Sequence, residues 1–161
     1  MEQKLSLSVN GRPVETSVFT TASLLDVLRE QLNITSPKKG CDMGDCGTCT
    51  VLLDGVPVNS CLVLALSAQG REVTTIEGIG TAQNLHPLQK AFYDWDAAQC
   101  GYCSPGIILT AKAFLDKNPD PSRDDVNLAI SGNLCRCTGY VKIVDAILDV
   151  ARSQTSATAA R

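Results

Sequence analysis

Eight cysteines fall into two sets of four, and this grouping constrains the fold more than any other feature of the sequence. Three cysteines of the first set stand on the glycine-rich stretch GCDMGDCGTC with the spacing C-x4-C-x2-C. The two sets are Cys41, Cys46, Cys49 and Cys61, and Cys100, Cys103, Cys135 and Cys137. A fold for this chain has to place three thiols on one short loop, bring a fourth from elsewhere, and build a second site further along the chain.

The spacing of the first set is typical of the ligands of a plant-type [2Fe–2S] cluster. Such a cluster needs thiolates that approach from different directions, so a loop can supply three and a separate element must supply the fourth. We expect Cys61 to fill that role from the start of a strand. Gly40, Gly44 and Gly47 permit positive φ angles and, because they lack a Cβ, let backbone N–H groups approach the sulfur atoms.

The second set forms the pairs C-x2-C and C-x-C, and each pair precedes a predicted helix. Helix N-termini carry unsatisfied N–H groups and partial positive charge, which favour an anionic cluster placed between them. Zinc is the alternative occupant: the first spacing is unusual for zinc, whereas the second set on its own suits zinc as well as an iron–sulfur cluster. A disulfide framework is a third interpretation, which the tight first loop disfavours.

Composition and charge exclude two classes of partner. The net charge of −3, without a basic run, gives no electrostatic footprint for nucleic acid, and no apolar run is long enough to span a membrane. The N-terminal stretch MEQKLSLSVNGR lacks the apolar core of a signal peptide, so we expect a cytoplasmic protein. Clustered cysteines in that compartment bind metal or serve redox chemistry more often than they form disulfides.

The periodicity of apolar residues divides the chain into a β-rich half and a helical half, which predicts an α+β fold. Hairpins are predicted around the turns Asn10-Gly11 and Asp54-Gly55, and Ser23 is predicted to cap a helix. The expected strands cover 4–9, 12–18, 49–53, 56–66 and 72–77, and the expected helices cover 23–32, 86–95, 104–118, 122–130 and 139–151. The expected units are a first domain over 1–77, a linker over 78–83, a second domain over 84–152 and a flexible tail over 153–161.

Three motifs in this order, GCDMGDCGTCTV, QCGYCSPG and GNLCRCTGY, resemble those of the iron–sulfur small subunits of the molybdenum hydroxylases, the xanthine dehydrogenase and aldehyde oxidase family. The resemblance runs from Leu5 to Ala151. It implies a β-grasp, ferredoxin-like [2Fe–2S] domain followed by a four-helix-bundle [2Fe–2S] domain. It also implies that each cysteine set holds one cluster.

The resemblance further implies an electron-transfer subunit of a molybdopterin-dependent hydroxylase or dehydrogenase, or of an aromatic acyl-CoA reductase, with no catalytic residue on this chain. Molybdopterin would be contacted by Gln99 and Cys137 and held by a large subunit. FAD would be held by a medium subunit, in a heterotrimer or a dimer of heterotrimers. A stand-alone ferredoxin-like carrier and a zinc-binding interaction module remain alternatives. We expect His86 at a helix start, and Trp95 and Tyr102 either at a subunit interface or in the core.

Overall fold

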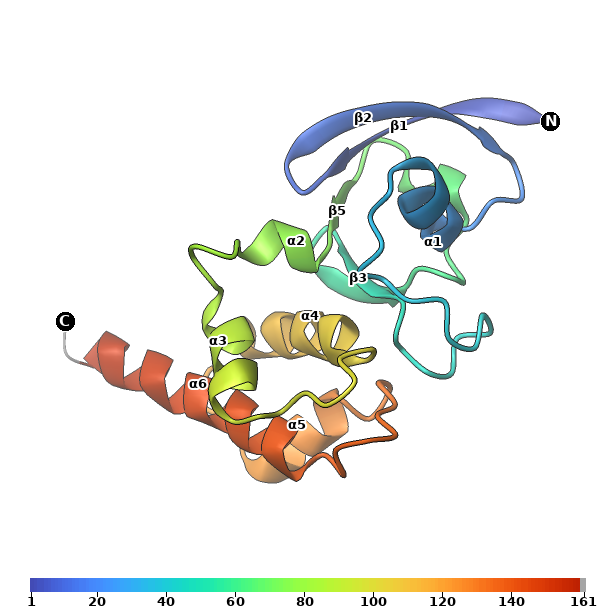
Figure 1. Cartoon of the computed structure of the whole chain (residues 1–161). Coiled ribbons are helices and arrows are strands. Elements are labelled where there is room, and N and C mark those ends of the chain that lie inside the picture. Colours follow the sequence, from blue (N-terminus) through green and yellow to red (C-terminus); the bar gives the residue numbers. More distant parts are fainter. Residues whose placement is uncertain (160–161) are drawn as a thin grey trace.

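The computed structural model describes residues 1–159, and it shows a sheet-containing part packed against a helical part (Figure 1). The sheet has five strands in the order β2-β1-β5-β3-β4. The neighbouring strands β1 and β5 are parallel, and the other neighbours are antiparallel. The strands are β1 (Glu2–Val9), β2 (Arg12–Phe19), β3 (Thr50–Leu53), β4 (Val56–Asn59) and β5 (Glu72–Thr74). The α+β class and the ferredoxin-like first domain are thereby confirmed.

Both predicted hairpins are present, and their turns explain why. Asn10 and Gly11 have φ angles of 52° and 73°, and Asp54 and Gly55 have φ angles of 50° and 78°. Two successive positive φ angles are the mark of a type I′ turn, which matches the twist of the flanking strands. The two turns therefore fix the registers of β1 with β2 and of β3 with β4.

A helical segment covers one face of the sheet and closes the first core. It consists of α1 (Leu24–Asp26) and a π-helical continuation η1 (Val27–Gln31), where the sequence predicts one regular helix over 23–32. The Ser23 hydroxyl accepts a hydrogen bond from the Asp26 N–H at 3.1 Å, so the predicted cap is confirmed. The core beneath it contains Leu5, Leu7, Val9, Val18, Leu24, Val27, Leu28, Val51, Leu53 and Val73, all buried.

The strand predicted over 56–66 is wrong beyond Asn59. The chain turns at that point, with the Leu62 N–H donating to the Asn59 carbonyl at 2.9 Å, and a 3-10 helix η2 (Ala65–Ala68) follows. The Cys49 carbonyl accepts both the Ser60 N–H at 3.4 Å and the Ser60 hydroxyl at 2.7 Å, so Ser60 is held beside the start of β3 where the chain turns. Cys61 consequently lies in a turn after β4 and not in a strand.

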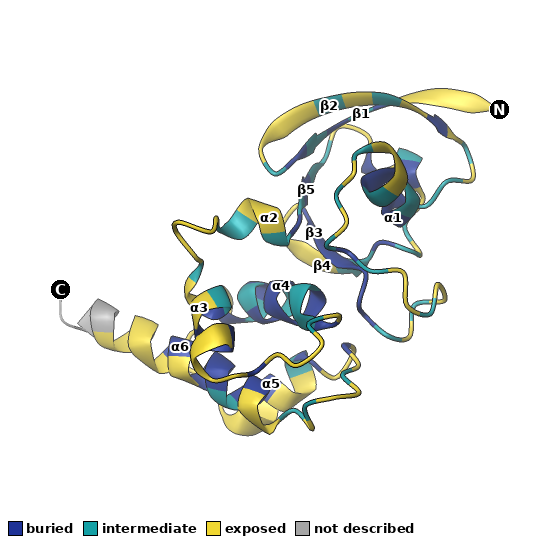
Figure 2. Cartoon of the chain, viewed as in Figure 1, coloured by how far each residue is buried: buried dark blue, intermediate teal, exposed yellow. Residues whose placement is uncertain are grey.

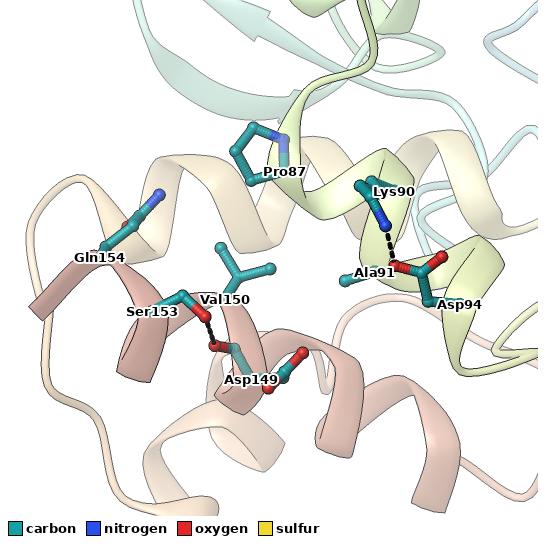
Figure 3. A pocket seen from close by; sticks show the side chains of 8 residues that line it. All are labelled: Pro87, Lys90, Ala91, Asp94, Asp149, Val150, Ser153 and Gln154. Atoms are coloured by element: carbon teal, nitrogen blue, oxygen red, sulfur yellow. Dashed lines mark hydrogen bonds and ion pairs between the residues drawn. The ribbon is translucent and has the colours of Figure 1, made fainter. Parts of the chain in front are cut away.

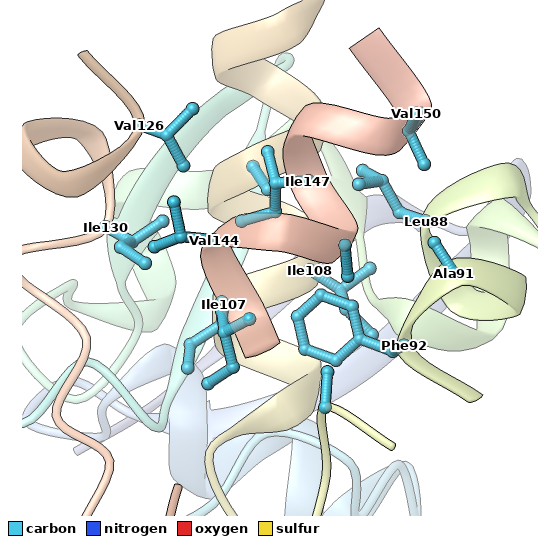
Figure 4. Close-up of a cluster of buried hydrophobic side chains, with 14 of the residues drawn as sticks. Leu88, Ala91, Phe92, Ile107, Ile108, Val126, Ile130, Val144, Ile147 and Val150 are labelled. Atoms are coloured by element: carbon cyan, nitrogen blue, oxygen red, sulfur yellow. The ribbon is translucent and has the colours of Figure 1, made fainter. Parts of the chain in front are cut away.

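The helical part contains the four predicted helices and a short additional one. The helices are α2 (Ile76–Ile79), α3 (Pro87–Asp94), α4 (Ser104–Leu115), α5 (Arg123–Ala129) and α6 (Val141–Ala159). The side chains of α3, α4, α5 and α6 converge in one core, which includes Leu88, Phe92, Ile107, Ile108, Val126, Val144 and Ile147 (Figure 4). His86 and Ser122 cap α3 and α5 through capping boxes, as predicted for both helix starts.

Several predicted boundaries differ from the observed elements, and the strand expected over 72–77 is wrong beyond Thr74, because α2 begins at Ile76. α2 ends at Ile79, inside the expected linker over 78–83. α6 runs through the expected tail as far as Ala159. Along this extension the Ser153, Thr155 and Ser156 hydroxyls each donate to the carbonyl four residues earlier, so these polar side chains bond to the helix backbone itself. Residues 160–161 of the expected tail lie outside the described residues.

The two parts share an apolar contact between β3 and α4. Leu52 from β3 is buried against Leu109 and Ala113 from α4, with Ile79 packed beside them. Figure 2 shows α4 buried or half-buried along its length, whereas the outer surface of α6 is largely exposed. Among the described residues, no helix is both long and apolar enough to cross a membrane.

A groove of about 370 Å³ lies between α3 and α6 (Figure 3). Its lining mixes apolar and charged side chains, and Lys90 pairs with Asp94 within it. The lining residues are Pro87, Lys90, Ala91, Asp94, Asp149, Val150, Ser153 and Gln154. None of the residues proposed from the sequence as metal ligands or pterin contacts lines this groove, so the candidate sites must be sought on the cysteine loops.

Candidate metal centres

The first cysteine set is assembled by the β3–β4 hairpin. Cys49 immediately precedes β3, and the pairing of Thr50 with Asn59 brings the start of β3 next to the end of β4. The turn after β4 then places the Cys61 Sγ 3.4 Å from the Cys49 Sγ. The hairpin register therefore explains how a cysteine 12 residues away in sequence reaches the loop.

The other two thiols of the first set are held by the loop itself. The Cys41 Sγ accepts hydrogen bonds from the N–H groups of Cys46 at 3.4 Å and Met43 at 3.5 Å. The Cys46 Sγ lies 3.2 Å from the Thr48 hydroxyl oxygen. Backbone N–H groups directed at sulfur are the interactions that stabilise an anionic cluster.

The glycines of this loop are needed for two different reasons. Gly44 and Gly47 have φ angles of 88° and 66°, which confirms the prediction for these two positions. Gly40 does not adopt a positive φ, so what it contributes to the loop is the absence of a Cβ. A Cβ on Gly40 would lie 2.7 Å from the Thr48 Oγ1 and 2.9 Å from the Cys46 Sγ. Gly40 is therefore required for close packing rather than for its backbone angle.

The second set comes from two loops that precede helices, as predicted. Cys100 and Cys103 lie at the start of α4, where Cys103 is the residue before the first helical turn. Cys135 and Cys137 lie between α5 and α6. The Cys137 Sγ lies 3.6 Å from the Cys100 Sγ, so packing of the helices brings the C-x2-C pair and the C-x-C pair together.

The second set has an inner side and an outer side. Cys103 is buried with 8% exposure and Cys135 is half-buried, whereas Cys100 and Cys137 are exposed. The Cys135 Sγ lies 3.1 Å from the Thr138 hydroxyl oxygen. A group bound here would therefore present one edge to the protein interior and the other edge to the surface.

The disulfide interpretation is wrong for this structure, because all eight cysteines are free thiols. The sulfur atoms of the close pairs are separated by 3.4 Å and 3.6 Å, whereas a disulfide bond is about 2.0 Å long. Two thiolates on one tetrahedral metal, with bonds of about 2.3 Å, are about 3.7 Å apart. The pairs thus have the spacing of thiolates that share a metal.

The arrangement also bears on the number of metal ions. A two-iron cluster takes two thiolates on each iron, so pairs of thiols are the arrangement it uses. The donor set of four thiols with N–H groups and hydroxyls around them fits such a cluster at each site.

The pKa values of the thiols depend on these surroundings. The N–H groups of Met43 and Cys46 lower the pKa of Cys41 to about 7. Burial and the neighbouring Cys49 thiol raise the pKa of Cys61 to about 11, and burial raises the pKa of Cys103 to about 12. Because thiolates are the metal ligands, metal binding must release the protons of Cys61 and Cys103. Each set thus includes one thiol that loses its proton, as metal binding requires, more readily at higher pH.

Gln99 is exposed and immediately precedes Cys100, so it lies on the outer side of the second set together with Cys137. Tyr102, expected at an interface or in the core, donates from its hydroxyl to the Lys39 carbonyl at 2.9 Å and so joins the two parts of the chain. Trp95 is 40% exposed, and its indole N–H donates to Asp149 on α6.

Three residues that join or support the two sites were not predicted from the sequence. The Leu134 N–H donates to the Cys46 carbonyl at 2.9 Å, and the buried Asn133 side chain donates to the Gly47 carbonyl at 2.9 Å. The Tyr140 hydroxyl accepts from the Cys135 N–H at 2.7 Å. All three residues lie within the third cysteine motif, which was the sequence feature that could have pointed to them. The spacing of the cysteines alone does not reveal contacts between motifs.

Two family models match this chain in succession. The model described as a 2Fe-2S iron-sulfur cluster binding domain matches residues 7–73, and the model described as a [2Fe-2S] binding domain matches residues 75–148. Each match contains one complete cysteine set, so both sets lie in domains that bind this type of cluster.

Similar proteins share the whole two-part arrangement. One subunit of the nicotinate dehydrogenase of Pseudomonas putida is 47% identical over 96% of this chain and 98% of its own length. A chain in the crystal structure of quinoline 2-oxidoreductase from Pseudomonas putida 86 is 44% identical, with a TM-score of 0.92 over 98% of this chain and 97% of its own length. The aldehyde oxidoreductase of Megalodesulfovibrio gigas is 50% identical over 94% of this chain, which corresponds to 17% of that longer protein.

Proposed function

This chain belongs to the iron–sulfur subunits of the molybdenum hydroxylase family, and from this premise we propose that its two cysteine sets each hold one [2Fe–2S] cluster in an electron-transfer relay. The observation that carries the proposal is one close thiol pair in each set, Cys49 with Cys61 and Cys100 with Cys137, with Sγ separations of 3.4 Å and 3.6 Å. A bound cluster supplies one-electron transfer. The chain supplies the thiolates and the N–H groups around them.

The proposed ligands of the first cluster are Cys41, Cys46, Cys49 and Cys61, and those of the second are Cys100, Cys103, Cys135 and Cys137. The first loop directs N–H groups at sulfur, and the second set stands before α4 and α6. Both features stabilise negative charge. Each cluster is therefore stabilised by the backbone as well as by its ligands.

The outer side of the second set is the proposed entry point for electrons from a molybdopterin-binding large subunit. Gln99, Cys100 and Cys137 are all exposed there, which would allow direct contact with the pterin. We assign the pterin contacts to Gln99 and Cys137. Electrons would then leave through the first cluster to an external acceptor or to an FAD-binding medium subunit.

The assembly that follows is a cytoplasmic heterotrimer or a dimer of heterotrimers, in which this chain contributes no substrate chemistry. The named relatives act in nicotinate dehydrogenase and quinoline 2-oxidoreductase, and both names place the chemistry on N-heteroaromatic compounds. The substrate of the whole enzyme is accordingly a compound that a partner subunit oxidises, and we infer no narrower substrate class from this chain.

Metal and sulfide analysis of the chain purified without oxygen, in complex with its co-produced partners, tests the proposal. We expect about four irons and about four acid-labile sulfides per chain, and two distinct reduced-cluster signals in electron paramagnetic resonance (EPR) spectra. A zinc-loaded protein without sulfide would contradict the proposal and support the zinc-binding module. A fully loaded chain that migrates alone at 17.1 kDa and never associates would support a stand-alone carrier.

The pterin contacts need a separate test. Gln99→Ala removes a side chain that is exposed in this chain, so we expect unchanged iron content and slower reduction of both clusters by substrate. Chemical reduction by dithionite should proceed at the unaltered rate. Unchanged reduction by substrate would contradict the role of Gln99.

A further inference from the structure

Glycines from all three cysteine motifs and an asparagine from the third meet between the two parts of the chain. A Cβ on Gly47 would lie 2.2 Å from the Gly132 carbonyl oxygen, and a Cβ on Gly106 would lie 2.5 Å from the Gly47 carbonyl oxygen. The backbones therefore approach as closely as glycine permits. This contact joins the first cysteine loop, the start of α4 and the segment before Cys135.

Asn133 fills the centre of this contact. It is buried with 3% exposure, and its side-chain amide donates to the Gly47 carbonyl at 2.9 Å and to the Thr50 hydroxyl at 3.2 Å. The Thr50 hydroxyl in turn donates to the Gly47 carbonyl at 2.7 Å. A buried amide with two defined acceptors has one favourable orientation, so it fixes the position of the backbone that carries it.

The segment that Asn133 begins leads directly into the second cysteine set. The next residue, Leu134, donates its N–H to the Cys46 carbonyl, and the residue after that is Cys135. On its other side the segment is held by Tyr140, whose hydroxyl accepts from the Cys135 N–H and donates to the Asn133 carbonyl at 3.1 Å. Residues 133–135 are therefore attached to the first loop by one set of hydrogen bonds and to the helical part by another.

We propose that Asn133 is a positioning residue that fixes the separation of the two iron–sulfur sites by holding the segment before Cys135 against the Cys46–Gly47 turn. The proposal rests on the proposed function, because it concerns the distance between two clusters. Electron transfer and magnetic interaction between two centres both depend steeply on that distance. A clamp that joins one ligand loop to the other controls this separation more directly than the neighbouring packing of Leu52 against Leu109 does.

The test compares the purified complex containing the unaltered chain with complexes carrying Asn133→Ala and Asn127→Ala. Asn127 is an exposed asparagine on α5, so its substitution controls for loss of an amide in the same part of the chain. The readouts are iron content, thermal stability and the EPR splitting or relaxation enhancement that each reduced cluster causes in the other. If the unaltered chain lacks two clusters, the proposed function itself fails, which is distinguishable from failure of the clamp.

With both clusters assembled, we expect Asn133→Ala to lose or broaden the resolved magnetic interaction, while Asn127→Ala retains it. A purely structural role would lower the melting temperature and leave the interaction in the folded protein unchanged, and that result would overturn the proposal. If Asn133→Ala fails to assemble, Thr50→Val decides the question. It keeps the side-chain shape, removes the second acceptor of the amide, and should broaden the interaction; an unchanged interaction in this variant would overturn the proposal.

Tyr140→Phe separates the two attachments of the segment. It removes the hydroxyl bonded to the Cys135 N–H and leaves the Asn133 amide in place. We expect a shift in the reduction potential of the second cluster with the magnetic interaction retained. Loss of the interaction in Tyr140→Phe together with its retention in Asn133→Ala would assign the positioning role to Tyr140 and overturn our assignment.

Discussion

The first cysteine set takes three thiols from the stretch Cys41–Cys49 and the fourth from the adjoining hairpin turn. The second set joins two loops instead, and 31 residues lie between Cys103 and Cys135. The first arrangement needs a loop and a hairpin, which are local structures. The second exists only when α4, α5 and α6 pack together. One site is therefore specified mainly by local sequence and the other by tertiary packing, and they should respond differently to perturbation.

The largest expected effect comes from a substitution at the contact between the two cysteine sites. Gly47→Ala combines a positive φ of 66° with a Cβ only 2.2 Å from the Gly132 carbonyl oxygen. Backbone strain costs about 1–3 kcal/mol and overpacking about 1–3 kcal/mol more, so we expect loss of about 2–6 kcal/mol in the free energy of unfolding. Denaturant unfolding measures the loss, and iron content should fall at both sites.

Gly55→Ala is the matched control, because Gly55 also has a positive φ, 78°, but a Cβ there meets nothing within 4 Å. It should show only the cost of backbone strain and should keep both clusters. Equal destabilisation by the two substitutions would mean that the close approach between the two parts contributes nothing.

The second prediction asks whether the tertiary site fails first. Ile147 on α6 is fully buried in the helical core, and Ile147→Ala should cost about 2–5 kcal/mol. We expect the second cluster signal to disappear at lower urea concentration than the first, as followed by the separate EPR signals of the two clusters.

Leu28→Ala in the first core is the converse variant, since Leu28 is also fully buried. It should affect the first signal more than the second. Simultaneous loss of both signals in both variants would show that the two parts unfold as one unit, and would remove the distinction between a local and a tertiary site.

The same distinction explains which features the sequence could predict. The Asn10-Gly11 and Asp54-Gly55 turns and the Ser23 cap depend on neighbouring residues, and all were predicted correctly. The strand expected through Cys61 was wrong, because the chain turns after Asn59, where the Leu62 N–H donates to the Asn59 carbonyl. Local alternation of apolar residues contains no information about that hydrogen bond.

The grouping of the cysteines could be predicted from spacing, but the contacts between the groups could not. The hydrogen bond from Asn133 to Gly47 joins residues 86 positions apart. Gly40 shows the same limit: its position in the motif was noticed, but its role depends on the side chains of Thr48 and Cys46. Predicting these contacts requires the packing of the helices on the sheet, which periodicity does not specify.

Helix caps give smaller effects that should stay within one part of the chain. Ser122→Ala removes the hydroxyl that accepts from the Asp125 N–H at 3.2 Å, and Ser23→Ala removes the equivalent cap of α1. Each should cost about 1 kcal/mol in the free energy of unfolding. Cluster-resolved denaturation should show that Ser122→Ala shifts the second transition and that Ser23→Ala shifts the first. A shift of the opposite transition would contradict the local character of these caps.

The smallest expected effect is a pH dependence confined to the helical part. The His86 Nδ1 accepts the Leu88 N–H at 3.2 Å, which requires the neutral ring, and burial together with Lys112 lowers the pKa of His86. The folded state thus binds this proton less readily than the unfolded state does. The stabilisation is present above the unfolded pKa of about 6.5 and is lost as pH falls through the lowered folded value.

His86→Asn provides the comparison, because asparagine caps helices well and does not titrate in this range. Between about pH 8 and about pH 5, the unaltered chain should lose more unfolding free energy than the variant, with the excess located in the transition of the helical part. His86 is the only histidine in the chain, so no other imidazole contributes to the difference. Parallel pH profiles for the two proteins would show that the His86 cap has the same protonation in the folded and unfolded states.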